Sequence, residues 1–313
     1  MTAAYAFHAP LDGVQYVEIP VSGITSSVFV LGRPGETVLV DSGSAEMAPG
    51  IIETLEANGV RRGAVRALII THGHVDHYGG AAAVAAWSGA PVWAHPAAAM
   101  QIEDHWGDYI IPGTATANAT AADWDRFKAG AGEDVRVDRM LREGDALEVA
   151  GRRLEVFHMP GHQRGELVLF ERERRLAFVG DMMQGSADAS TNWLGLYYDV
   201  AGQRRSLARL KGLGPAWLFR GHRPPRTGPD VAADLAAAVA RLDKIERAIR
   251  DALDAEAPLT VARAAQVAFK KVLGMDIAGA ANYALVTVTA FLLDLAQRGL
   301  ARRNNDLSWE PVR

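Results

Sequence analysis

The sequence contains no cysteine among its 313 residues. This absence excludes disulfide bonds and thiolate ligands, so any metal site must be built from nitrogen and oxygen donors. The sequence has no run of 18 apolar residues, so we expect no membrane-spanning helix and no membrane partner. The N-terminus lacks a basic segment followed by an apolar core. We therefore expect no signal peptide, and a cytoplasmic location.

The sequence also lacks a strong charge of either sign. Its 33 Lys and Arg nearly balance 37 Asp and Glu, which gives a formal net charge of −4 and a pI near 6.1. This balance provides no basic surface for nucleic acid, so we expect a small-molecule substrate instead. Apolar residues make up 49% of the chain and charged residues 22%, as in an ordinary globular protein.

A dense cluster of potential metal ligands lies in the segment His72-Gly73-His74-Val75-Asp76-His77. The apolar run before it predicts a buried strand, and the Ala-rich segment after it predicts a helix. His72 and His74 are two residues apart in the turn between them, so their side chains leave the same face. Imidazole and carboxylate suit zinc and similar divalent metals. Taken singly, each histidine could be an ordinary residue, and Asp76 could be a helix N-cap.

Polar side chains of the same kinds follow other predicted strands. The residues that come just after a predicted strand are Asp41, His72, His162, Asp181 and His222. Side chains on loops at one set of strand ends are how a rigid sheet presents a site. Asp41 alone could equally be a turn-forming residue. Taken together, the five positions predict a single site at one edge of a sheet.

The order of these motifs resembles that of the metallo-β-lactamase-fold hydrolases, over about residues 14–225. The motifs that carry the resemblance are Asp41-Ser42-Gly43, His72-x-His74-x-Asp76-His77, Pro160-Gly161-His162, Gly180-Asp181 and Gly221-His222. The resemblance implies an α+β fold, an αββα sandwich with the site at one edge. Gln163-Arg164-Gly165 departs from the commonest pattern, in which a small hydroxyl residue follows the histidine, so the substrate side of that loop is expected to differ.

The resemblance also implies two divalent metal ions, zinc first, with manganese and iron as alternatives. The first ion would be bound by His72, His74 and His162, and the second by Asp76, His77 and His222. Asp181 would bridge the two ions, and Asp41 would support the site without binding metal. A hydroxide shared by the ions would attack the substrate, and Asp76 would orient it and move its proton.

We expect two domains, a catalytic domain at 1–228 with an insertion at about 96–140, and a C-terminal domain at 229–313. Helices are predicted at Val231–Ala255, Val261–Val272 and Ala280–Arg298, followed by a hairpin. This order resembles the winged-helix-like tail of one branch of the family. Its 11 basic and 11 acidic residues cancel, which argues against nucleic acid. We expect the tail to pack against the catalytic domain or to form a homodimer.

Aromatic residues and arginines around the predicted site are candidates for substrate contacts. The candidates are Trp106, Tyr109, Trp193, Tyr197, Tyr198, Arg164 and Arg223. Either tyrosine of the 197–198 pair could donate to a developing oxyanion, and the arginines could hold a carboxylate or phosphate. Each could instead be a packing or solvated side chain.

The sequence favours a hydrolase of small carboxyl derivatives, namely thioesters, lactones or esters. The acidic pI and the aromatic segments suit an apolar acyl group. The alternatives are a metal-dependent endoribonuclease of the winged-helix-tailed branch, a β-lactamase, and a non-enzymatic binding protein. The endoribonuclease needs a basic groove that the sequence does not display, and the full ligand set argues against a protein without activity.

Overall fold

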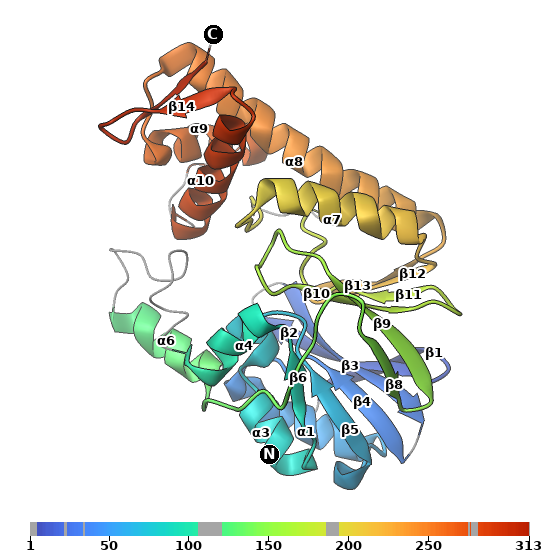
Figure 1. Ribbon diagram of the computed structural model, residues 1–313. Helices are drawn as coiled ribbons and strands as arrows, with labels where there is room; N and C mark the ends of the chain where they lie inside the picture. Colours follow the sequence, from blue (N-terminus) through green and yellow to red (C-terminus); the bar gives the residue numbers. More distant parts are fainter. Residues whose placement is uncertain are drawn as a thin grey trace.

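The computed structural model describes residues 5–21, 24–33, 35–105, 121–185, 194–274, 276 and 281–312. These residues form two sheets packed face to face, with helices on both outer faces (Figure 1). The predicted α+β class and the αββα sandwich are therefore confirmed. No helix in the described ranges is long and apolar enough to cross a membrane.

The first sheet has seven strands in sequential order, antiparallel up to the fourth strand and parallel from there on. Its strands are β1 (Ala6–Leu11), β2 (Val14–Val21), β3 (Ile24–Arg33), β4 (Glu36–Val40), β5 (Val65–Ile69), β6 (Val92–Ala94) and β7 (Arg139–Met140). The β4 run Thr37-Val38-Leu39-Val40 is buried on both faces, as a strand between two layers must be. The helix α1 (Ala48–Ala57) packs Ile51 and Leu55 on the outer face of this sheet.

Further helices lie between consecutive strands of this sheet in the sequence. They are η1 (Ala45–Met47), η2 (Arg62–Ala64), α2 (Val75–Tyr78), α3 (Ala81–Ser88), α4 (Pro96–Glu103) and α6 (Ala121–Ala131). The described residues of the stretch 96–140, which we expected to be an insertion, thus include the helices α4 and α6 and the edge strand β7. The helix α4 begins at Pro96 because proline favours the first turn, and His95 caps it by accepting the Ala97 N–H.

The second sheet has six strands in the order β13-β12-β11-β10-β9-β8, in which only β11 and β12 are parallel. Its strands are β8 (Ala146–Val149), β9 (Arg152–His158), β10 (Leu167–Glu171), β11 (Leu176–Phe178), β12 (Trp217–Arg220) and β13 (Arg223–Thr227). The helices α7 (Val200–Leu213) and α8 (Pro229–Glu256) cover its outer face (Figure 1).

The aromatic centre of the sandwich joins the two sheets. Phe29 of β3 meets Phe178 of β11 edge-on, with 5.5 Å between the ring centroids. Phe178 and Phe219 of β12 stack at 4.6 Å, and all three rings are buried. Such contacts between inner faces set the spacing of the layers, on which the strand-end loops depend.

The C-terminal residues form three helices and a hairpin, close to the predicted ranges. After α8 come α9 (Val261–Leu273), α10 (Ala281–Gln297), β14 (Ala301–Arg303) and β15 (Trp309–Pro311). The 28-residue α8 runs beside α7 and extends to these elements (Figure 1). One apolar cluster runs from Phe170 in the second sheet to Trp309 in the hairpin. The C-terminal elements are therefore packed against the sandwich through a shared core.

Replacement of Phe178 by alanine is expected to destabilise the sandwich by about 3–5 kcal/mol, because it removes a fully buried ring from between the sheets. Urea unfolding of the full chain measures this change. Leu307→Ala is the control, because Leu307 is 59% exposed and should alter the free energy of unfolding by less than about 0.5 kcal/mol. Equal effects of the two substitutions would contradict the proposed packing.

Candidate metal centre

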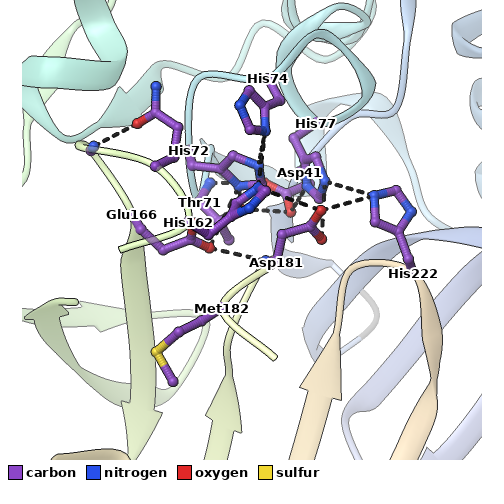
Figure 2. A network of polar contacts seen from close by, with 12 residues as sticks. Asp41, Thr71, His72, His74, His77, His162, Glu166, Asp181, Met182 and His222 are labelled. Atoms are coloured by element: carbon purple, nitrogen blue, oxygen red, sulfur yellow. Dashed lines mark hydrogen bonds and ion pairs between the residues drawn. The ribbon is translucent and has the colours of Figure 1, made fainter. Parts of the chain in front are cut away.

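The predicted ligands come together at one edge of the sandwich. Strands β4 and β5 are parallel, and so are β11 and β12, so the loops after each pair open at the same end. Asp41 follows β4 and His72 follows β5, while Asp181 follows β11 and His222 follows β12. Figure 2 shows their side chains, with those of His74, His77 and His162, pointing toward one another.

Within the described residues, the polar side chains at this edge form three overlapping groups able to hold a metal ion. The groups are His72, His74 and His162; His72, His77 and Asp181; and Asp76, His77 and His222. The ligand atoms of each group lie within 4.8 Å of one another. The structure thus brings together all seven side chains for which the sequence predicted metal binding.

The first group presents three imidazole nitrogens to a common point. Nδ1 of His74 lies 3.0 Å from Nε2 of His72 and 3.0 Å from Nε2 of His162. Burial, with His162 nearby, lowers the pKa of His74 to about 3, and burial likewise lowers the pKa of the other two. These imidazoles are therefore neutral at pH 7, which is the form that binds metal.

The carboxylates belong to the second side of the centre. Nε2 of His222 lies 3.0 Å from Oδ2 of Asp76 and 3.0 Å from Oδ2 of Asp181. Burial alone would raise the pKa of both carboxyl groups, but His77 and His222 outweigh it and hold each pKa well below its usual range. Both groups are therefore ionised at neutral pH. Asp181 also places Oδ1 3.4 Å from Nε2 of His77 and Oδ2 3.7 Å from Nε2 of His162, so it touches both sides.

Hydrogen bonds to the outer ring nitrogens orient four of the histidines. The contacts of Nδ1 are His72 with Thr71 Oγ1 at 3.1 Å, His77 with Asp41 Oδ2 at 2.9 Å, His162 with the Leu196 carbonyl at 2.8 Å and His222 with the Thr25 carbonyl at 3.1 Å. An imidazole held in this way keeps Nε2 free for a cation. The imidazole and carboxylate donors fit a divalent metal, and so do the hydrogen bonds behind the rings, whose partners we call the outer layer of the centre.

Asp41 holds the loop after β5 as well as His77. Its Oδ1 accepts the Thr71 N–H at 2.8 Å and its Oδ2 accepts the Thr71 hydroxyl at 2.9 Å. The backbone of Asp41 is left-handed, with φ of 65°, a conformation that aspartate tolerates better than most residues. Asp41 belongs to none of the three ligand groups, although it contacts one of their members.

Glu166 is a residue of the site that sequence reasoning missed. It is fully buried, and its Oε1 accepts the Asp181 N–H at 2.9 Å. The same oxygen lies 3.7 Å from Nδ1 of His72. Burial and the charge of Asp181 raise the pKa of Glu166 well above its usual value. The only available signal was an acidic residue directly before the apolar run of β10, and no known motif draws attention to it.

The two candidate tyrosines, Tyr197 and Tyr198, have different surroundings in the structure. Tyr198 is half-buried beside the centre, with its ring centroid 6.4 Å from that of His74. Tyr197 is instead packed in the core against Phe291, at 6.2 Å, and burial raises its pKa. The structure therefore places Tyr198 near the candidate metal ligands and packs the ring of Tyr197 in the core.

The two candidate arginines lie close in sequence to metal-ligand candidates, Arg164 in the loop after β9 and Arg223 at the start of β13. Arg164 is exposed two residues after His162, and Arg223 is half-buried directly after His222. Arg220, the last residue of β12, is buried in an ion pair with Asp234 and is not available to a substrate. The predictions for Trp106, Tyr109 and Trp193 fall outside the described residues.

The matched family model agrees with this geometry. Residues 21–222 match the metallo-beta-lactamase superfamily, and the chain belongs to that superfamily. The family resemblance expected from the motifs is confirmed, and with it a metal-dependent hydrolase in a family that uses divalent metals. The match ends before α8, so it says nothing of a winged-helix-like tail.

Known proteins resemble the chain at low identity. A metallo-beta-lactamase family protein of Thermus thermophilus has the same fold, with a TM-score of 0.74 and 23% identity over 97% of this chain and 100% of that one. The hydroxyacylglutathione hydrolase GloC of Haemophilus influenzae is 28% identical over 53% of this chain and 70% of its own length. The acyl-coenzyme A thioesterase MBLAC2 of Gallus gallus is 39% identical over 25% of this chain and 27% of its own length.

Replacement of Asp41 by asparagine is expected to weaken zinc binding by about 10–100-fold, because it removes the charged acceptor that orients His77. Competition with a chromophoric chelator measures the affinity. Asp138→Asn is the matched control, because Asp138 also accepts a backbone N–H, from Val92, but belongs to none of the three ligand groups. A folded Asp41→Asn protein with unchanged zinc affinity would exclude the orienting role.

Proposed function

We propose that the protein is a dinuclear metal-dependent hydrolase of small carboxyl derivatives, with thioesters as the first candidates and lactones and esters after them. The overlap of the ligand groups carries the proposal. His72 and His77 each belong to two groups, and the seven side chains are too many for one ion with tetrahedral coordination. Two adjoining ions use the whole set.

The proposed ligand sets follow from these groups. His72, His74 and His162 would hold one ion, and Asp76, His77 and His222 would hold the other. Asp181 would bridge them, which is supported by its contacts to His77, His162 and His222. Five imidazoles and two carboxylates without sulfur favour zinc, and manganese or iron also accept such donors.

The bound cations would supply an activated water at neutral pH and polarise the scissile carbonyl. The residues of the chain then move protons and position the substrate. Asp76 is ionised, and its side chain is 39% exposed, so it can accept a proton from the attacking water. We assign to the Tyr198 hydroxyl a hydrogen bond to the substrate oxygen on which charge develops.

Relatives and charge support the substrate class. The curated relatives include a hydroxyacylglutathione hydrolase and an acyl-coenzyme A thioesterase, both of which act on acyl compounds. The net charge of −4 argues against a nucleic acid substrate, since proteins that bind nucleic acid are usually basic. We therefore propose a small-molecule substrate and place RNA and β-lactams second.

A parallel substrate screen tests the proposal. The full chain loaded with zinc should hydrolyse one or more acyl-coenzyme A thioesters, lactones or simple esters, and leave β-lactams and single-stranded RNA intact. Removal of the metal with a chelator should abolish the activity, and added zinc should restore it, because the activated water depends on the metal. Cleavage of RNA with every ester left intact would overturn the proposed substrate class.

Asp76→Asn is expected to lower kcat by about 10²–10⁴-fold at saturating zinc, because the amide cannot accept the proton that the carboxylate accepts. The metal content of the variant is measured beside its rate, so that loss of metal and loss of the base are separated. Asp251→Asn changes an exposed carboxylate of α8 and should leave kcat unchanged. A fully metal-loaded Asp76→Asn protein with the original kcat would rule out Asp76 as the base.

A further inference from the structure

The helix α10 contacts the short loop that orients a metal-ligand histidine. This helix lies beyond residue 222, where the match to the family model ends. The carbonyl of Leu196 accepts the hydrogen bond from Nδ1 of His162, at 2.8 Å. Leu196 lies in a loop before α7, so the orientation of its peptide group depends on what holds that loop.

A single hydroxyl group of α10 holds the loop on both sides of Leu196. The Oγ1 of Thr287 donates to the Gly195 carbonyl at 2.7 Å and accepts the Tyr197 N–H at 3.2 Å. A hydroxyl has one proton to donate, and Thr287 gives it to this loop. The two bonds fix the peptide groups that flank Leu196.

The surroundings of Thr287 make these bonds strong constraints. Thr287 is fully buried, and its neighbours in α10, Val288 and Phe291, belong to the apolar core. Because a buried hydroxyl without a hydrogen bond is costly, loss of the contact would destabilise the packing of α10 as well as the loop. The ring of Tyr197 packs on Phe291, which attaches the same loop to the same helix.

A separate contact ties α8 to the other side of the metal centre. Asp234 of α8 accepts a hydrogen bond from Nη1 of Arg220 at 2.6 Å, and both side chains are buried. The same guanidinium donates to the Pro224 carbonyl through Nη2 at 2.5 Å. Arg220 and Pro224 flank the turn that carries His222, so Asp234 fixes the base of that turn.

We propose that the C-terminal helices are a structural part of the metal centre. Thr287 is a positioning residue for His162 on one side, and Asp234 is a positioning residue for His222 on the other. The inference rests on the metal binding proposed above and is independent of the substrate.

The full-length protein and three variants test the role of Thr287. Thr287→Val keeps the shape of the side chain and removes the hydroxyl, whereas Thr287→Ser keeps the hydroxyl and removes the methyl group. Thr289→Val is the matched control on the same helix. Zinc affinities are measured by competition with a chromophoric chelator, and bound cadmium is followed by NMR, in which the position with three histidines and the position with Asp76 give separate signals because their donor sets differ.

We expect Thr287→Val to weaken binding at the three-histidine position of His72, His74 and His162 about tenfold, and Thr287→Ser and Thr289→Val to bind as the unsubstituted protein does. A packing role alone would make the serine variant at least as defective as the valine variant. Equal affinities of Thr287→Val and the unsubstituted protein would therefore overturn the proposal, as would equal losses in Thr287→Val and Thr287→Ser. If the valine variant does not fold, Thr287→Ala and Thr287→Ser form the same comparison, because they differ only in the hydroxyl.

Asp234→Asn tests the second contact. We expect it to weaken the position with Asp76, His77 and His222 and to leave the three-histidine position unchanged, the reverse of Thr287→Val. Equal weakening of both positions in both variants would show general destabilisation and overturn the assignment. An unsubstituted protein that binds no metal would overturn the proposed function together with this inference, whereas metal binding that is equal in all variants would overturn this inference alone.

Discussion

The burial of several imidazoles in one small volume is the constraint on which the rest of the structure depends. The Nδ1 nitrogen of His74 lies 3.0 Å from ring nitrogens of both His72 and His162, and these last two rings are buried. Burial and mutual repulsion disfavour their protonation, so the cluster is uncharged and rich in lone pairs. Such a cluster is stable only if its geometry is imposed from outside, by the sheets beneath it and by the hydrogen bonds behind each ring.

The hydrogen-bond partners of the histidines, which form the outer layer of the centre, come from distant parts of the chain. The partner of His222 is a carbonyl of β3, that of His162 is a carbonyl of the loop before α7, and that of His77 is the carboxylate that follows β4. These three histidines are thus each oriented by an element other than their own. The site is fixed by the way the two sheets and their helices pack, which agrees with the exact placement that metal ligands require.

The sequence predicted the ligands because metal chemistry restricts residue type and spacing. His72, Asp76 and His162 could be proposed from residue type and spacing alone, and strand patterns predicted that His72 and His162 lie at one edge. The outer layer could not be found in this way. Backbone carbonyls such as that of Leu196 carry no side-chain signal, and Glu166 and Thr287 acquire their roles only through contacts between residues distant in the sequence. The different surroundings of Tyr197 and Tyr198 likewise depended on a local register that composition does not reveal.

The apolar cluster that joins β10 to β15 has a consequence for how the chain unfolds. It includes Phe170 of the sandwich, Leu242 of α8 and Trp309 of the final hairpin, all buried in one continuous set of contacts. Two units that share a core cannot open independently, since separation would expose the apolar faces of both. The chain should therefore unfold in one cooperative thermal transition. Residue 222 is where the match to the family ends, but it does not separate two independently stable units.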